Sequence, residues 1–216
     1  MNRYLKKGLD CFRSLCLLFF RRTKPSQSEE SIQNTFQYLK SQGVETELGN
    51  VELVGKPIIN CTDGGRIIIG KNVTLVSDST YNVAGINHPV ILVADGPGAV
   101  IRISDGVGIS GASIVTCSTI EIGEHVMIGA NCNIYGTDFH CMDTDRRLAQ
   151  KSMQEAPSAP IVIEDKCWLA SNVTVLKGVR IGRESVIGAM SLVNKDIPSH
   201  SIAAGVPAHV IRKNNQ

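Results

Sequence analysis

Aliphatic residues return at every sixth position over much of this chain. The period is strictest in the last third, where it is kept by Ile163, Leu169, Val175, Ile181, Ile187 and Val193. Four positions after each of these stands a residue that is mostly small or β-branched: Cys167, Val173, Val179, Ser185, Ser191 and Ile197. A period of six fits neither the 3.6-residue turn of an α-helix nor the two-residue alternation of a strand. It predicts short parallel strands separated by turns, stacked as the coils of a parallel β-helix.

Stacking explains why the period requires these residue types. Each coil lies about 4.8 Å from the next, the spacing of hydrogen-bonded strands. The aliphatic residue then fills an interior column, and the smaller residue four positions later fits a corner of the coil. Upstream, the same period is marked by Ile69, Leu75, Ile103, Ile109 and Val115, slips by one residue, and resumes at Ile122, Ile128 and Ile134. The pattern predicts an all-β domain over residues 48–213.

The sequence IYGTDFHCMDTDRR, residues 134–147, interrupts the period. From Ile134 to Ile163 the interval is 29 positions, which is not a multiple of six. A loop must therefore leave the stack of coils, and its polar composition places it at residues 138–160. Loops on a rigid solenoid commonly carry function, because the coils are committed to packing. His140 lies at the root of this loop, where the scaffold still fixes its position.

The first 47 residues lack the six-residue period and predict a short helical segment. Residues 3–22 place apolar and cationic side chains at helical spacing, and the run LCLLFF is too short to span a bilayer. Arginines follow it directly without a small-residue cleavage site, which argues against a signal peptide. A basic amphipathic helix at residues 1–22 can contact a membrane surface, but packing on this protein or on a neighbouring subunit is the favoured interpretation. A second helix is predicted from Ser28 to Ser41, ended by Gly43.

Composition narrows the functional classes. The chain has 216 residues, 43% hydrophobic and 19% charged, with a net charge of +2, which suits one sizeable domain. Near-neutral charge without a basic stripe gives no case for nucleic-acid binding. Seven cysteines without a CxxC pair favour a reducing, cytoplasmic setting over a disulfide framework or a zinc site. Cys117, Cys132 and Cys167 fall among the repeats, where buried thiols are expected.

Residues 163–213, IEDKCWLASNVTVLKGVRIGRESVIGAMSLVNKDIPSHSIAAGVPAHVIRK, resemble the C-terminal half of hexapeptide-repeat acetyltransferases, above all the sugar O-acetyltransferases. The similarity extends over roughly residues 100–213. It implies that the parallel β-helix is left-handed and that the protein is a homotrimer. It also implies that acetyl-CoA binds in a groove between neighbouring subunits and that the acceptor is a sugar or glycan.

Transfer of an acetyl group from a thioester to a hydroxyl needs a base that accepts the hydroxyl proton. Imidazole exchanges protons near neutral pH, and related enzymes place a histidine at this loop position, so His140 is the predicted catalytic base. The alternative for a lone histidine in a polar loop is a solvated side chain. Asp138 and Asp143 are candidates to orient its second ring nitrogen, and a backbone carbonyl would serve equally well. Arg146 and Arg147 are expected in solvent, with an acidic glycan as the alternative partner.

The resemblance also assigns binding residues. Trp168 would line the tunnel for acetyl-CoA and acceptor, with a rim residue that caps the core as the alternative. Asn133 and Ser113, on the coils before the loop, are candidate acceptor contacts, with corner packing as the alternative. The residue-wise match places cofactor contacts at Ser171, Ala189, Asn194, Lys195 and Arg212, with Lys177 and Lys213 as weaker candidates. No metal site is expected, because the remaining histidines, His88, His125, His200 and His209, are well separated.

These features together favour a cytoplasmic, acetyl-CoA-dependent O-acetyltransferase that acts on a sugar or a polysaccharide of the capsule or lipopolysaccharide type. One alternative is the same chemistry on an amine or small acceptor such as serine, an amino sugar or an antibiotic. A second alternative is a non-catalytic β-helix scaffold. Retention of both His140 and Trp168 argues against the scaffold.

Overall fold

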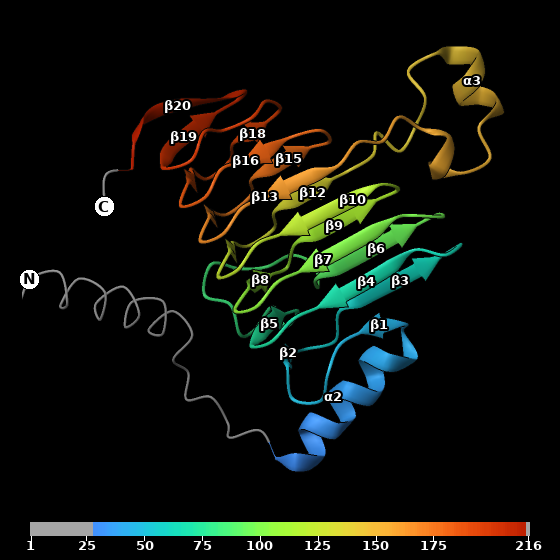
Figure 1. The fold of residues 1–216 in the computed structure, drawn as a ribbon, viewed down its shortest axis with the longest axis vertical. Coiled ribbons are helices and arrows are strands. Elements are labelled where there is room, and N and C mark those ends of the chain that lie inside the picture. Colours follow the sequence, from blue (N-terminus) through green and yellow to red (C-terminus); the bar gives the residue numbers. More distant parts are fainter. Residues whose placement is uncertain (1–27, 215–216) are drawn as a thin grey trace, which may run out of the picture.

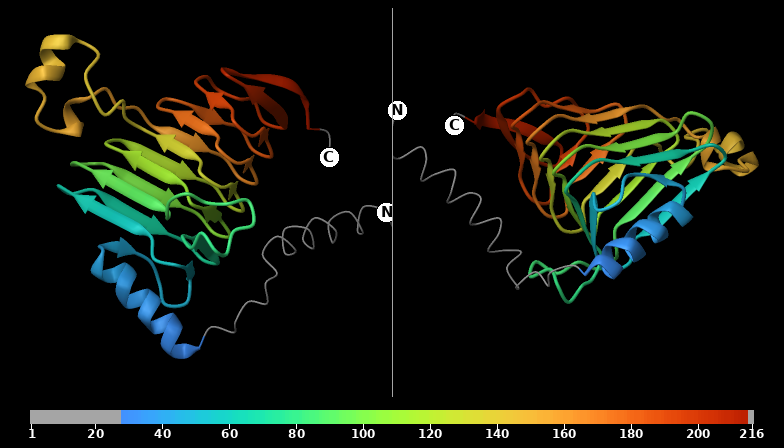
Figure 2. Two further views of the ribbon diagram at one scale, coloured as in Figure 1. Left: turned by 180° about the vertical axis from the view of Figure 1, so that it is seen from behind. Right: turned by 60° about the horizontal axis from the view of Figure 1, so that its bottom comes forward.

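The computed structural model describes residues 28–214, in which short strands form three sheets that make the faces of a prism (Figures 1 and 2). The first face contains β1 (Val44–Glu45), β4 (Arg66–Ile69), β7 (Val100–Ile103), β10 (Thr119–Ile122), β13 (Ile161–Ile163) and β16 (Arg180–Ile181). The second contains β2 (Val51–Val54), β5 (Val73–Val76), β8 (Gly108–Ser110), β11 (Met127–Ile128), β14 (Trp168–Leu169), β17 (Val186–Ile187), β19 (Ser201–Gly205) and β20 (Ala208–Lys213). The third contains β3 (Ile58–Thr62), β6 (Ile91–Asp95), β9 (Ser113–Thr116), β12 (Asn133–Tyr135), β15 (Thr174–Leu176) and β18 (Leu192–Val193).

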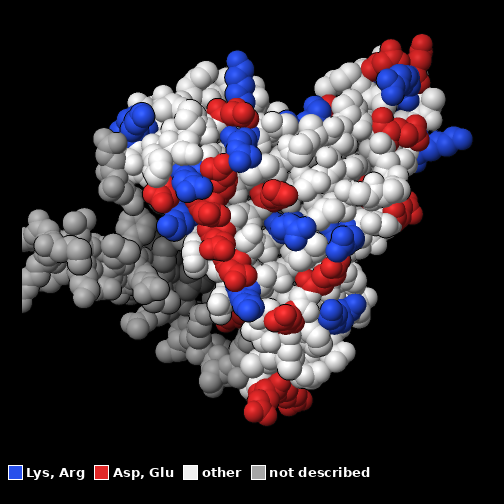
Figure 3. All heavy atoms as spheres, in the orientation of Figure 1, with Lys and Arg blue, Asp and Glu red and all other residues white. Residues whose placement is uncertain are grey.

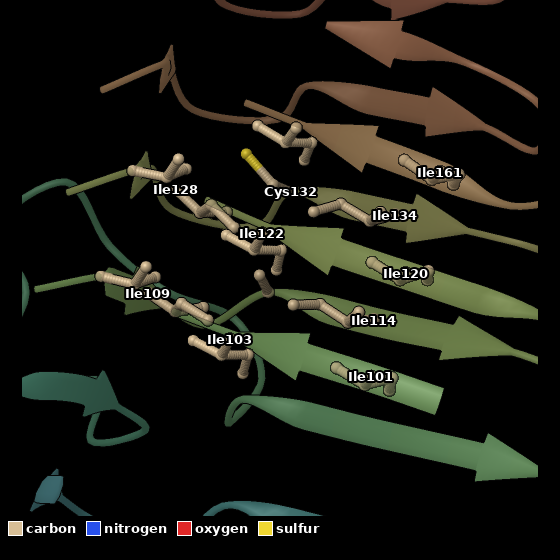
Figure 4. Close-up of a cluster of buried hydrophobic side chains, with 14 of the residues drawn as sticks. Ile101, Ile103, Ile109, Ile114, Ile120, Ile122, Ile128, Cys132, Ile134 and Ile161 are labelled. Carbon is tan, nitrogen blue, oxygen red and sulfur yellow. The ribbon is translucent and has the colours of Figure 1, made fainter. Parts of the chain in front are cut away.

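The chain visits the three faces in turn, and every strand from β1 to β19 pairs in parallel with a strand of a neighbouring coil. This arrangement is the left-handed parallel β-helix that the resemblance implied. The strict period of six is confirmed: its residues form interior columns on the three faces, with Ile163 stacked on Ile181, Leu169 on Ile187 and Val175 on Val193. All six aliphatic residues from Ile163 to Val193 are fully buried, and the six residues that follow them at four positions are buried as well. The stacked isoleucines of the middle coils are visible in Figure 4.

One residue of the upstream period was assigned wrongly. Ile114, not Val115, stands in register with Ile134 and with the preceding coil, and its side chain is fully buried. Val115 instead pairs with Tyr135, on the alternate side of the strand. The corner before Ile114 is one residue short and contains Gly111 at a φ of +49°. A short corner moves the next inward-facing position forward by one residue, and spacing alone cannot choose between two adjacent aliphatic residues.

Other elements cover the two ends of the stack. The predicted second helix is confirmed as α2 (Glu29–Ser41), which packs on β1 and β2 and buries Leu39 (Figure 1). Ser28 caps it, since the hydroxyl oxygen accepts a hydrogen bond from the Ser31 N–H at 3.1 Å. At the other end, β20 folds back antiparallel to β19. The predicted basic helix at residues 1–22 lies outside the described residues.

The predicted loop does leave the prism between β12 and β13, and it has structure of its own. It carries a short helix, α3 (Thr144–Ala149), and a 3-10 turn at Met153–Glu155 (Figure 1). A second insertion, residues 77–90, lies between β5 and β6. Between residues 28 and 214, no helix is long and apolar enough to cross a membrane.

Candidate active site

The loop that carries His140 leaves at the corner between the third and first faces. Its two arms form an antiparallel bridge between Thr137 and Ser158. The Asp138 N–H donates to the Pro157 carbonyl at 3.0 Å, and the Ala159 N–H donates to the carbonyl of Gly136 at 3.1 Å. These bonds hold the two arms of the loop together at its root, two residues before the histidine.

A tight turn then presents His140 to solvent. The His140 N–H donates to the Asp138 carbonyl at 2.7 Å, and the residue between them, Phe139, has a φ of +62°. A bond between residues two apart around a positive φ is a γ-turn of the rare, strained kind. The Phe139 ring packs edge-on against Tyr135, with the ring centroids 5.0 Å apart. The side chain of His140 is exposed.

The two aspartates proposed to orient His140 have other partners. The Asp138 carboxylate lies 2.8 Å from the Lys177 ammonium, with 22% of the aspartate and 29% of the lysine side chain exposed. The Asp143 carboxylate caps α3 by accepting from the Arg146 N–H at 2.9 Å. No residue from 28 to 214 hydrogen-bonds to the imidazole ring of His140, so an orienting role for either carboxylate stays a prediction.

Two loop residues that sequence reasoning did not assign to the site hold the segment around His140. The Gln150 amide nitrogen donates to the Phe139 carbonyl at 2.8 Å, and its amide oxygen accepts from the Cys141 N–H at 2.9 Å. Arg147, expected in solvent, donates to the carbonyls of Cys141 at 3.1 Å and Met142 at 2.9 Å. Neither role has a signal in the sequence, because each bond depends on how the loop itself folds.

Polar side chains stand side by side on the third face, next to the corner that carries this turn. Ser113 and Asn133 are register partners on neighbouring strands, as are Asn133 and Thr174. The Asn133 amide oxygen accepts from the Tyr135 hydroxyl at 2.8 Å, and the Tyr135 ring contacts Phe139. The structure therefore brings both predicted acceptor residues to the face whose edge carries His140.

Trp168 lies on a different face. It belongs to β14, in the second sheet, between register partners Met127 and Val186. The residue is 42% exposed, so it lies open on the surface. Trp168 and Asn133 thus occupy separate faces of one prism.

The predicted cofactor residues fall at three places. Ser171 and Ala189 occupy the same corner, between the second and third faces, in successive coils, where the Met190 N–H donates to the Ser171 carbonyl at 3.0 Å. Asn194 and Lys195 are exposed and follow β18, at the corner that also carries the loop root. The third place is β20, on which Arg212 and Lys213 are exposed. Lys177 is engaged by Asp138.

The described thiols have packing roles or lie at the margin of the core. Cys132 and Cys167 are buried as predicted, and burial raises the pKa of each thiol to about 11. Both thiols are therefore protonated at neutral pH. Cys117 is only half-buried, contrary to the prediction, and burial followed by the charge of Asp95 raises its pKa. Within residues 28–214, no group of three His, Cys, Asp or Glu side chains is placed to hold a metal ion.

Comparison with known proteins gives two family models and several relatives. The model described as bacterial transferase hexapeptide (six repeats) matches residues 160–195, and the hexapeptide repeat of succinyl-transferase matches residues 119–138. Galactoside O-acetyltransferase of Lactococcus lactis is 43% identical over 103 residues, which are 48% of this chain and 47% of that protein. The chain therefore spans about half the length of that relative.

A longer alignment joins the chain to WbbJ of Escherichia coli K12, a protein named for O-acetyl transfer in lipopolysaccharide biosynthesis. The two are 34% identical over 155 residues, which cover 70% of this chain and 74% of WbbJ. Among solved structures, the Bacillus cereus N-acyltransferase AntD, in complex with dTDP-4-amino-4,6-dideoxyglucose and coenzyme A, superposes with a TM-score of 0.61. It is 19% identical and covers 84% of this chain and 90% of its own, a similarity of fold alone.

Proposed function

The chain belongs to the family of hexapeptide-repeat acetyltransferases, and we propose that it transfers the acetyl group of acetyl-CoA to a hydroxyl of a sugar or polysaccharide. The observation that carries this proposal is His140. Its exposed imidazole stands at the root of an ejected loop that the Asp138–Lys177 ion pair and the hydrogen bonds of Gln154 attach to the β-helix. A solvent-accessible imidazole on an anchored loop is the kind of group that hydroxyl activation needs.

In the proposed reaction, the imidazole of His140 accepts the hydroxyl proton as the oxygen attacks the carbonyl carbon of the thioester. A C–O bond forms, and the resulting tetrahedral intermediate collapses with cleavage of the C–S bond. The imidazolium returns its proton to the departing thiolate, so the products are the acetyl ester and free CoA. The second ring nitrogen has no hydrogen-bond partner among residues 28–214, so a group of the bound acceptor or of a neighbouring subunit can hydrogen-bond to it.

A sugar or polysaccharide acceptor is supported by the polar third face and by the similarity to WbbJ. Ser113 and Asn133 place a hydroxyl and an amide on neighbouring strands of that face, and such groups hydrogen-bond readily to sugar hydroxyls. WbbJ, whose name refers to lipopolysaccharide, aligns over 74% of its length. We therefore place the acceptor along this face, with the capsule or lipopolysaccharide type as its class.

We further propose that the protein is a homotrimer whose sites are completed between subunits. One chain places Trp168 on the second face and His140 at the edge of the third. A neighbouring subunit can bring its second face to the first subunit's loop, so that acetyl-CoA lies between Trp168 and His140. Ser171, Ala189, Asn194, Lys195 and Arg212 are the proposed contacts for CoA, and no metal ion takes part.

Mixing inactive variants tests the shared site. His140→Ala and Trp168→Ala are each expected to lose most turnover as homotrimers. If the two residues meet across an interface, co-refolded mixtures regain part of the wild-type rate, because some interfaces combine both native residues. Mixtures no more active than either parent would contradict a site shared in this way. The trimer itself is measured by analytical ultracentrifugation.

The proposed location is the cytoplasm, where acetyl-CoA is available and free thiols persist. Residues 1–22 are proposed as a peripheral contact with the inner membrane surface. Cosedimentation with anionic vesicles tests this contact, using the full chain and a variant that lacks residues 1–22. Equal binding by both proteins would refute it.

The overall activity is tested by measuring thiol release from acetyl-CoA across a panel of acceptors. The panel contains galactosides, capsular and lipopolysaccharide oligosaccharides, amino sugars, serine and aminoglycosides, and mass spectrometry identifies each product. The proposal expects an acetyl ester on a saccharide. Selective acetylation of an amine would replace the hydroxyl acceptor, and the absence of transfer to every acceptor would favour the scaffold.

A further inference from the structure

We propose that Gln150 is the positioning residue of the active site, because its side-chain amide holds the strained turn that presents His140. The inference rests on the proposed role of His140 as the base. It concerns a loop residue to which sequence reasoning gave no role.

The turn before His140 needs external support. Phe139 has a φ of +62° and lies inside a hydrogen-bonded turn between Asp138 and His140. Bulky residues seldom adopt this conformation, and strained backbone of this kind persists where surrounding contacts over-determine it. Such contacts therefore decide where the imidazole stands.

Gln150 contacts the backbone on both sides of the histidine. Its amide nitrogen donates to the carbonyl of Phe139 at 2.8 Å, and its amide oxygen accepts from the N–H of Cys141 at 2.9 Å. The same nitrogen donates to the Ser152 carbonyl at 2.8 Å, and this third bond fixes the Gln150 side chain against the second arm of the loop. Among residues 28–214, no other side chain is bonded to both neighbours of His140.

The other contacts of this segment act on one side of His140 only. Lys177 holds the carboxylate of Asp138, and Tyr135 packs against the ring of Phe139. Arg147 binds carbonyls beyond the histidine. Without Gln150, the Phe139 carbonyl and the Cys141 N–H both lose their partner, and the turn can relax towards a less strained backbone. The imidazole would then leave the position from which it reaches the acceptor hydroxyl.

Gln150→Met tests this inference, because methionine keeps the length of the side chain and removes all three hydrogen bonds. The matched control is Gln154→Met in the same loop. Gln154 is also half-buried, and its amide nitrogen binds Asp63 at 2.9 Å and Asp95 at 3.3 Å, contacts that attach the loop to the coils. The two variants make the same chemical change, but only the first touches the neighbours of His140.

We expect Gln150→Met to lower kcat about 10- to 100-fold, the effect of a misplaced catalytic group, with the KM for acetyl-CoA unchanged within about twofold. Gln154→Met should keep kcat within about threefold of the wild type. A second readout needs no turnover: the Cε1–H resonance of His140 in ¹H–¹³C NMR, identified by its loss in His140→Ala. It should shift or broaden in Gln150→Met and remain in place in Gln154→Met.

Two results would overturn the inference. One is an equal fall of kcat in both variants, which would assign the effect to general loosening of the loop. The other is wild-type turnover together with an unmoved His140 resonance in Gln150→Met. Failure of the proposed function has a different signature, because His140→Ala would then retain full turnover. In that case, the NMR resonance alone would decide whether Gln150 fixes the turn.

Discussion

Replacing Lys177 by methionine separates two possible roles of this lysine: anchoring the loop and binding CoA. The Lys177 ammonium lies 2.8 Å from the Asp138 carboxylate, with 29% and 22% of the side chains exposed. Exposed ion pairs contribute up to about 1 kcal/mol, whereas hydrogen bonds to charged groups in less exposed settings contribute about 1.5–3 kcal/mol. The intermediate exposure of this pair places its coupling at about 1–2 kcal/mol, between these two ranges.

A double-mutant cycle measures that coupling directly. Urea unfolding is followed for the wild type, Lys177→Met, Asp138→Asn and the double variant, and the non-additive part of the free energies is the pair's contribution. For a domain of this size, each kcal/mol moves the Tm by about 2–4 °C. We therefore expect Lys177→Met to lower the Tm by roughly 2–8 °C, and to lower it far less when Asp138 is already neutral.

The kinetics of the same four proteins decide the functional role. If Lys177 anchors the loop, Lys177→Met lowers kcat and leaves the KM for acetyl-CoA unchanged, and Asp138→Asn has the same effect. If Lys177 instead binds a CoA phosphate, the KM for acetyl-CoA rises in Lys177→Met and not in Asp138→Asn. Additive free energies together with that rise in KM would refute the anchoring role.

Three further predictions address the scaffold, the thiols and the cofactor groove. Gly65→Ala should destabilise the fold by about 1–3 kcal/mol, because the added Cβ would overlap with the backbone of the neighbouring coil. In Gly108→Ala the added Cβ meets open space, so this control should be nearly neutral in thermal unfolding. Cys132 and Cys167, with pKa values raised to about 11 by burial, should resist iodoacetamide at pH 8 in the folded protein and react once it is unfolded; rapid labelling of the native protein would contradict their burial. Trp168 is the chain's single tryptophan and is 42% exposed, so CoA binding should change its fluorescence, and a saturable CoA complex without such a change would remove it from the groove.

The distribution of surface charges bears on which cations are available to bind the CoA phosphates. Lys and Arg side chains are scattered over the face seen in Figure 3, and Asp and Glu side chains form a continuous strip along it beside several of these cations. The Arg180 guanidinium lies 2.7 Å from Glu164, and that of Arg66 lies 2.6 Å from Glu45, so several cations on the coils are paired within the chain. CoA phosphates would therefore depend on the exposed cations near the C-terminal end of the stack, such as Lys195 and Arg212.

The scaffold was predictable from the sequence because a β-helix buries its core in one repeated way. Each column position must be aliphatic in every coil, so the period itself identified Ile163 and its five successors. The prediction of Val115 in place of Ile114 was wrong where the corner lost one residue, since corner geometry decides which of two adjacent residues points inward. Periodicity contains no information about that geometry.

The candidate site was predictable only in part. The break in the period located His140, because the regular coils cannot accommodate the extra residues. Gln150 and the partner of Lys177 could not be found in this way, since their bonds depend on the folded path of residues 138–160. The separation of Trp168 from His140 likewise depends on which face each strand occupies. The resemblance identified both residues as site candidates but did not indicate that one chain places them on different faces.

The most direct test of the central claim compares His140→Ala with the wild type under saturating acetyl-CoA and the best saccharide acceptor. General-base catalysis contributes about 10²- to 10⁴-fold, so kcat should fall by that factor. CoA affinity, measured by calorimetry, should remain at the wild-type value, because the role proposed for His140 concerns the acceptor proton. A kcat within a few-fold of the wild type, with CoA binding intact, would contradict the assignment of His140 as the base.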